Sequence, residues 1–255
     1  MSRPLRKTIL ITGASSGLGE GMARQFAAMG RNLALCARRT DRLEALKAEL
    51  LKAHPGIRIS VRALDVNEHQ QVFDVFQAFA AEFGSIDRVI VNAGLGKGQP
   101  LGTGWFFKAN LLTAQTNFVA ALAQCEAAME IFRKQNAGHL VVISSMSAMR
   151  GMGGNITTYA ATKAGLSALA EGLHVETIKK RLPIRVTTLH PGYIETELSG
   201  SSAKTPFMVD NETGVRSMVA AIEREPVEAS VPGWPWRLIG WAMRNLPIGW
   251  VIKIT

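Results

Sequence analysis

Six short runs of apolar residues alternate along the chain with longer segments in which apolar residues recur at helical spacing. The short runs are rich in Val, Ile and Leu and lack polar alternation, which is typical of strands covered on both faces. They predict strands at Thr8–Thr12, Asn32–Ala37, Ile57–Leu64, Ile86–Val91, His139–Ser144 and Ile184–Leu189. The longer segments predict helices at roughly 17–29, 40–53, 68–83, 106–135 and 158–181.

Strand–helix alternation of this kind predicts an α/β fold in which a parallel sheet is covered by helices on both sides. Ligands of such folds bind at the carboxyl ends of the strands. The chain has 255 residues, of which 47% are hydrophobic, and this suits one domain with a sizeable core. The pattern changes after Leu189, where the Gly/Ser/Thr-rich stretch Glu195–Thr205 predicts a mobile loop.

Composition narrows the range of partners. The chain has 29 Lys and Arg against 20 Asp and Glu, a net charge of +9, which favours anionic partners such as nucleic acid, anionic lipid or a phosphorylated cofactor. The basic residues are not interleaved with aromatic residues, so we expect no nucleic acid. Cys36 and Cys125 lie in apolar segments, which predicts buried free thiols in a reducing compartment. We expect no signal peptide, no membrane-spanning helix and no metal site, and therefore a cytoplasmic protein.

A glycine-rich turn follows the first predicted strand and precedes the first predicted helix, with the spacing GxxxGxG. Glycines let the backbone turn tightly and approach a pyrophosphate, and the helix that follows offers free N–H groups. The turn is therefore a candidate dinucleotide site, formed by Gly13, Ser15, Ser16, Gly17, Leu18 and Gly19.

The end of the second predicted strand bears on which dinucleotide is bound. An acidic residue there would hold the 2′-hydroxyl of NAD, whereas an arginine suits the 2′-phosphate of NADP. Here Ala37 is followed by Arg38 and Arg39, whose guanidinium groups match a phosphate. The ends of the third and fourth strands complete the candidate cofactor site with Asp65, Val66, Asn92, Ala93 and Gly94.

The main candidate for chemistry is the pair Tyr159 and Lys163. Residues four apart share one face of a helix. Tyrosine has a pKa of about 10, and a neighbouring ammonium favours the phenolate and lowers that pKa. The fifth predicted strand ends in Ser144-Ser145, so a hydroxyl points toward the same edge of the sheet.

Together these motifs resemble the shorter branch of the short-chain dehydrogenase/reductase family. They are TGASSGLG, the NAG at 92–94, the serine after the fifth strand, YAATK at 159–163 and the Pro-Gly after the sixth strand, and they span roughly residues 7–196. The resemblance implies a single Rossmann-like domain of three layers with a seven-stranded parallel sheet. It implies Tyr159 as proton donor or acceptor, Lys163 as holder of the nicotinamide ribose, and Ser145 as a hydrogen-bond partner of the reacting oxygen. At the nicotinamide end it places Pro191, Gly192, Ile194 and Thr196.

Some positions leave alternatives open. The family usually adds an asparagine in the helix before the fifth strand, and the 28 residues between Asn117 and Ser145 favour Asn117 over Asn110. The interval from Ser145 to Tyr159 is about one residue longer than is common, so Ser144 or Ser147 could take the serine's role. Ser16 stands where many NADP-preferring relatives have a basic residue, so the preference for NADP depends on residues 37–39.

We therefore expect an NADP-dependent oxidoreductase that moves a hydride between the nicotinamide and a carbonyl or alcohol, as a homodimer or homotetramer. The alternative is a catalytically silent dinucleotide sensor on the same fold, which would not need an acid-base tyrosine. Epimerases and dehydratases of the extended branch normally carry a larger substrate domain than the residues after Gly192 allow. An apolar substrate is indicated by the side chains expected around the pocket, which are Met146, Met149, Met152, Trp105, Phe207 and Met208.

Four of the five tryptophans lie in the final 22 residues, which distinguishes a Trp-rich amphipathic tail, 234–255, from the catalytic domain, 1–233. Pro235 could open a helix there and Pro247 would close it. One face of this helix would carry an apolar stripe of Trp236, Ile239, Met243 and Leu246. The stripe could cover the substrate pocket or a partner subunit, or the tail could attach the enzyme to the cytoplasmic face of a membrane.

Overall fold

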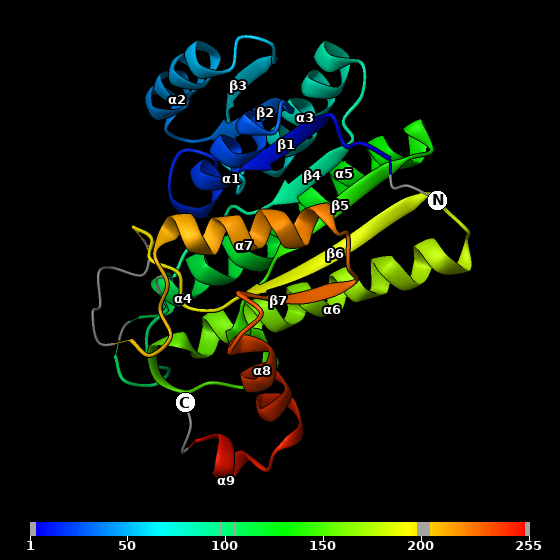
Figure 1. Ribbon diagram of the computed structural model, residues 1–255. Helices are drawn as coiled ribbons and strands as arrows, with labels where there is room; N and C mark the ends of the chain where they lie inside the picture. The colour runs from blue at the N-terminus through cyan, green and yellow to red at the C-terminus, as the bar shows by residue number, and fades with distance from the viewer. Residues whose placement is uncertain (1–3, 97, 105, 198–204, 253–255) are drawn as a thin grey trace.

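The computed structural model describes residues 4–96, 98–104, 106–197 and 205–252. Its strands form one parallel, seven-stranded sheet in the order β3-β2-β1-β4-β5-β6-β7 (Figure 1). The strands are β1 (Thr8–Thr12), β2 (Asn32–Ala37), β3 (Ile59–Ala63), β4 (Arg88–Val91), β5 (Gly138–Ile143), β6 (Ile184–Pro191) and β7 (Glu228–Val231). The order reverses between β1 and β4, which is where α/β sheets of this kind form their ligand crevice.

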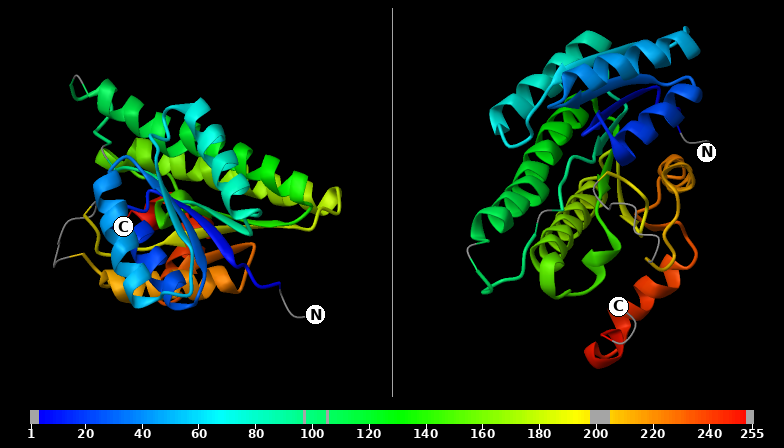
Figure 2. Two further views of the ribbon diagram at one scale, coloured as in Figure 1. Left: turned by 90° about the horizontal axis from the view of Figure 1, so that it is seen from above. Right: turned by 90° about the vertical axis from the view of Figure 1, so that its left-hand side faces the viewer.

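Helices cover both faces of the sheet, as the two views in Figure 2 show. One face packs on α1 (Gly17–Ala28), α2 (Thr40–Ala53) and α7 (Asn211–Glu223). The other face packs on α3 (His69–Phe83), α5 (Ala120–Gln135) and α6 (Thr157–Lys179). A shorter helix, α4 (Phe107–Ala114), continues through a π-helical turn, Gln115–Val119, into α5.

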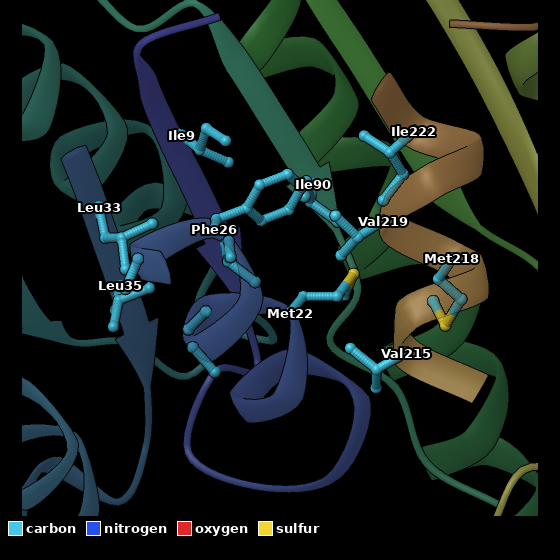
Figure 3. Packing of buried hydrophobic residues seen from close by; sticks show 14 of the residues in the cluster. Ile9, Met22, Phe26, Leu33, Leu35, Ile90, Val215, Met218, Val219 and Ile222 are labelled. Carbon is cyan, nitrogen blue, oxygen red and sulfur yellow. The ribbon is translucent and has the colours of Figure 1, made fainter. Parts of the chain in front are cut away.

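The strands are apolar on both sides because both sides are buried. Ile9 and Ile11 of β1 belong to the core beneath α1 and α7, whereas Leu10 belongs to the core beneath α3, α5 and α6. In Figure 3, Phe26 of α1 lies between Ile9 and Val219 of α7. The three-layered, doubly wound fold that the sequence predicts is confirmed.

The six predicted strands and the predicted helical segments lie within two residues of their expected ends. The pattern missed β7 and α7, although the family resemblance implies a seventh strand. β7 is a four-residue edge strand in which only Val231 is fully buried, so it lacks an apolar run. Of the predicted loop Glu195–Thr205, residues 198–204 lie outside the described residues.

The Trp-rich tail contains α8 (Trp236–Asn245) and α9 (Ile248–Val251). Its inner face buries Trp236, Met243 and Val251 against Met146 and Met149 of the short 3-10 helix after β5, and Ile239 and Leu246 pack on the same cluster. The predicted apolar stripe therefore faces the body of the molecule.

In the described ranges, no helix is long and apolar enough to cross a membrane. Within the same ranges, no three His, Cys, Asp or Glu side chains are grouped so that they could hold a metal ion. Cys36 and Cys125 are free and buried, as the sequence predicts.

Candidate active site

The glycine-rich turn between β1 and α1 depends on its glycines. Gly13 and Gly17 have φ values of +65° and +57°, a region that side chains disfavour. A Cβ atom on Gly19 would lie 2.3 Å from the carbonyl oxygen of Gly13, so no side chain fits there. The Ser16 side chain makes no capping hydrogen bond to the first turn of α1, and Leu18 packs on the core. The N–H groups of that turn are therefore free to bind a pyrophosphate.

The end of β4 is tied to this turn through Thr12, a contact that the sequence analysis missed. The Thr12 hydroxyl accepts hydrogen bonds from the N–H groups of Asn92 and Ala93, at 3.0 and 3.1 Å. In return, the Asn92 amide nitrogen donates to the Thr12 carbonyl at 2.9 Å. A Cβ atom on Gly13 would approach the Ala93 Cα to 2.9 Å. This close packing brings the residues expected at the cofactor together across β1 and β4.

Arg38 and Arg39 follow β2 at the same edge and differ in what they contact. The Arg39 guanidinium donates to the hydroxyls of Ser15 and Ser16 and also pairs with Glu197 at 3.3 Å. Arg38 is exposed and makes no side-chain hydrogen bond or ion pair within the described part of the chain. Two arginines thus form a cationic edge next to the turn. Arg39 is already bound to neighbouring side chains, and Arg38, in the described ranges, is not.

Asp65 shapes the loop after β3. Its Oδ1 atom accepts hydrogen bonds from the main-chain N–H and side-chain amide of Asn67, at 3.0 and 3.1 Å. Asn67 in turn accepts a hydrogen bond from Thr116 in the π-helical turn, at 3.1 Å. Val66 is buried in the core, so the loop is held between β3 and the helix that carries Asn117.

Tyr159 and Lys163 lie in the first two turns of α6. The Lys163 side chain is buried, and its Nζ donates to the carbonyl oxygen of Ile143 at 2.8 Å. Nζ also lies 5.8 Å from the centroid of the Tyr159 ring. The Ser145 side chain is close enough to the Tyr159 hydroxyl to lower its pKa, so the acid-base pair and the serine meet at the carboxyl end of β5.

The three candidate serines have different surroundings. Ser144 is buried and turns toward α6, where its hydroxyl donates to the Lys163 carbonyl at 3.0 Å and contacts Ser167. Ser147 donates to the Ser145 hydroxyl from both its main chain and its side chain, at 3.2 and 3.0 Å. Ser145 therefore lies next to Tyr159, with Ser147 behind it and Ser144 directed away.

Burial dominates the proton affinities of the pair. It raises the pKa of the Tyr159 hydroxyl above its ordinary value, and the hydrogen bond with Ser145 only partly opposes this. It lowers the pKa of Lys163 from 10.5 to about 8, because the buried ammonium has lost its water. In the protein alone, the tyrosine keeps its proton at neutral pH and the lysine is close to losing its own.

The two candidate asparagines also differ in position. Asn117 lies in the π-helical turn and exchanges hydrogen bonds with the main chain of Leu95, at 2.8 and 2.7 Å. A Cβ atom on Gly94 would lie 3.2 Å from Asn117 Oδ1 and 3.7 Å from Lys163 Nζ, so both side chains lie close to Gly94. Asn110 instead holds Gln99 and Thr158. Single π turns inside α-helices are frequent at functional sites.

The segment after β6 closes the other side of the crevice. A Cβ atom on Gly17 would contact Thr196 at 3.6 Å, so this segment reaches back to the glycine-rich turn. Ile194 is buried and bridges to Val209. Pro191 pairs with Val231 in the sheet, and Gly192 follows it directly beneath the tail.

Trp236, which the sequence analysis placed in an apolar stripe that could cover the pocket or a partner subunit, packs on the segment after β6. A Cβ atom on Gly192 would lie 2.1 Å from the indole ring, so only glycine lets the tail pack here. The ring meets Tyr193 and Phe207 edge-to-face, with centroid distances of 5.2 and 6.4 Å. Its Nε1 is buried and has no hydrogen-bond partner among the residues that the structure describes. Trp105, which was also expected at the pocket, lies outside the described residues.

Comparison with known proteins agrees with this geometry. A family model described as short chain dehydrogenase matches residues 7–206. An uncharacterized oxidoreductase of Mycobacterium tuberculosis is 57% identical, over 95% of this chain and 94% of its own. The NADP-dependent 3-hydroxy acid dehydrogenase of Schizosaccharomyces pombe is 35% identical, over 78% and 76%. The structure is similar to that of a short-chain dehydrogenase from Sphingobium yanoikuyae in complex with NADPH, with a TM-score of 0.79 and 26% identity over 94% of each chain.

The buried lysine gives the first testable prediction, which concerns stability. We expect Lys163→Met to raise the free energy of unfolding near pH 7 by on the order of 3 kcal/mol. Burial lowers the pKa of Lys163 from 10.5 to about 8. The unfolded chain therefore binds this proton more tightly, and the charge destabilises the fold fully below the folded pKa. The penalty fades as the pH rises from about 8 toward 10.5.

Thermal unfolding near pH 7 and near pH 10 measures this effect. Lys52→Met, at an exposed position of α2, is the matched control and should change stability little at either pH. A stabilisation by Lys163→Met that is equally large at both pH values would contradict the explanation.

Proposed function

Because the chain belongs to the short-chain dehydrogenase family, we propose that it transfers a hydride between NADP and a carbonyl or alcohol, with Tyr159 as the acid-base group. The observation that carries the proposal is the convergence of Tyr159, Ser145 and Lys163 at the end of β5. The silent-sensor alternative would leave this arrangement without a purpose. The glycine-rich turn and the uncapped N-terminus of α1 fit a dinucleotide at the adjacent strand ends.

The choice of NADP is supported by the cationic edge after β2. Arg38 and Arg39 stand where an acidic residue would hold an unphosphorylated ribose. The similar S. pombe protein is an NADP-dependent dehydrogenase, and the similar S. yanoikuyae structure is a complex with NADPH. Arg38 is free to turn toward a 2′-phosphate, whereas Arg39 would have to release Glu197.

In the reductive direction, bound NADPH supplies the hydride to the carbonyl carbon. Tyr159 gives its proton to the carbonyl oxygen, and its raised pKa keeps that proton in place until negative charge develops. Ser145 donates a hydrogen bond to the same oxygen and stabilises this charge. Lys163 holds the ribose and offers a positive charge beside the tyrosine, and Asn117 supports the turn next to it.

We propose an apolar substrate from the apolar residues that follow β5 and β6. Met146 and Met149 pack with Trp236 in one cluster just after Ser145, and Trp236 contacts Tyr193 and Phe207. Aromatic and thioether side chains favour apolar surfaces such as those of fatty, steroid-like or aromatic carbonyls. A panel of ketones, aldehydes and alcohols, followed through the absorbance of the reduced nicotinamide, tests this substrate class.

Tyr159→Phe should abolish turnover and leave cofactor affinity nearly unchanged, because the ring packing survives and only the hydroxyl is lost. General acid-base groups contribute about 10²–10⁴-fold to rates. Steady-state turnover and titration of NADPH fluorescence measure the two effects. Retention of more than about a tenth of the normal activity would show that another group carries the proton.

Arg38→Ala should narrow the preference for NADP over NAD at least about tenfold, since hydrogen bonds to charged groups contribute about 1.5–3 kcal/mol. Arg39→Ala should have a smaller effect, because Arg39 already bonds to Ser15, Ser16 and Glu197. Calorimetry with both cofactors measures the preference. Equal affinity of the unsubstituted protein for NAD and NADP would overturn the choice of cofactor.

We also propose that the tail contacts an anionic membrane surface peripherally. Trp241 and Trp250 are 59% and 68% exposed, and Leu238 and Ile252 are exposed beside them. Tryptophan and arginine suit the interface of a bilayer, and the basic net charge suits anionic lipid. Such attachment would bring the site close to a lipophilic substrate. A homodimer or homotetramer would present several tails to the membrane and bind it more strongly.

Trp241→Ser with Trp250→Ser should weaken co-sedimentation with anionic vesicles at least about tenfold, because each exposed indole can bury roughly 150–250 Å². These substitutions leave the buried Trp236 in place, which removal of the whole tail would not. Leu5→Ser, 65% exposed near the other end of the molecule, is the control. If the doubly substituted protein pellets as well as the original, the tail does not bind membrane.

A further inference from the structure

His190 lies near the carboxyl end of β6, immediately before Pro191, and is 1% exposed. Its Nδ1 atom is 3.2 Å from the carbonyl oxygen of Ser145, and its Nε2 atom is 3.2 Å from Oε1 of Glu228. Both partners are oxygen atoms that accept hydrogen bonds, and a neutral imidazole has a single N–H, so its tautomer decides which of the two it donates to. The imidazole lies between the main chain of the proposed catalytic serine and a carboxylate on β7.

The bridge continues into the tail. Arg244 of α8 donates to the same Glu228 oxygen at 2.6 Å. The hydrogen bond with His190, together with that from Arg244, lowers the pKa of Glu228 to about 2, although partial burial opposes this. Glu228 is therefore an anion at neutral pH and holds His190 on one side and α8 on the other.

These groups line a cavity of about 410 Å³ between α6, β6, β7 and α8. Glu171 and His174 of α6 face the same cavity. The His190 ring is almost fully enclosed, and its two nitrogens lie within hydrogen-bond distance of the Ser145 carbonyl and Glu228. The orientation of His190 is therefore tied to these two groups.

The orientation of the Ser145 carbonyl affects the segment on each side of it, because Ser145 caps the 3-10 helix that follows β5. The same oxygen accepts a hydrogen bond from the Ala148 N–H at 3.0 Å. Two donors, one on each segment, fix the plane of this peptide. The peptide plane in turn sets the direction of the Ser145 hydroxyl toward Tyr159.

We propose that His190 is a positioning residue for Ser145. We further propose that Glu228 and Arg244 link His190 to helix α8 of the tail. The proposal rests on the proposed function, since it concerns the reaction at Tyr159. It assigns a role to three side chains outside the candidate catalytic set of Asn117, Ser145, Tyr159 and Lys163.

His190→Leu should lower kcat about tenfold to a hundredfold, since displacements on the order of 1 Å at a reacting group have such effects. The Kd for NADPH should change less than about twofold, since the bridge does not reach the cofactor turn. His190→Asn should restore most of kcat, because its amide can still donate to the Ser145 carbonyl. His174→Leu, in the same cavity but without contact to Ser145, is the matched control and should leave kcat unchanged.

The decisive test repeats His190→Leu in a Ser145→Ala background. If His190 acts through the Ser145 hydroxyl, its substitution should change the residual kcat less than about twofold there. An equal loss in both backgrounds would overturn the proposal and make His190 a general structural residue. If His190→Leu fails to fold, Glu228→Ala replaces it, because Glu228 is half-exposed and easier to substitute. Its effect on kcat is then compared between the unsubstituted and the Ser145→Ala backgrounds.

The outcomes separate this proposal from the proposed function. If the unsubstituted protein reduces no carbonyl and oxidises no alcohol, the proposed function fails. If it turns over normally while His190→Leu and Glu228→Ala match the original kcat, only the positioning role fails.

Discussion

An ammonium group that leaves water needs hydrogen-bond acceptors, and Lys163 finds one in the carbonyl of Ile143, at the last residue of β5. This bond joins α6 to the carboxyl end of the sheet and places Tyr159, one turn earlier, beside Ser145. Gly94 lies over the same region, where a Cβ atom would press on Asn117 Oδ1 at 3.2 Å and reach Lys163 Nζ at 3.7 Å. The geometry of the site therefore follows from the need to satisfy one buried charge.

The tail completes this site from the far end of the chain. Trp236 packs so closely on Gly192 that a side chain at that position would displace it. The same indole forms aromatic contacts with Tyr193 and Phe207, so one residue joins α8 to the segment after β6 and to Phe207. The inner face of the tail is therefore packed on the rest of the molecule, although its outer face stays exposed.

Periodicity was sufficient to predict six strands because each is buried on both faces and therefore apolar throughout. It missed β7, where three of the four residues are not fully buried. The local motifs brought Tyr159, Ser145 and Lys163 together because they lie on adjoining elements. The contacts of Trp236 and of His190 with Glu228 could not be predicted, because they join residues tens of positions apart that no motif connects.

Two residues of α8 connect this helix to different parts of the site, so a displacement of α8 would affect both parts. Trp236 touches the segment after β6 at Gly192, while Arg244 reaches the segment after β5 through Glu228 and His190. These two segments lie on neighbouring strands, so a displacement of α8 would move both. Packed interfaces of this kind shift between discrete arrangements more readily than they deform gradually. A substrate, lipid or partner that repositions α8 would therefore act on the serine and on the pocket wall together.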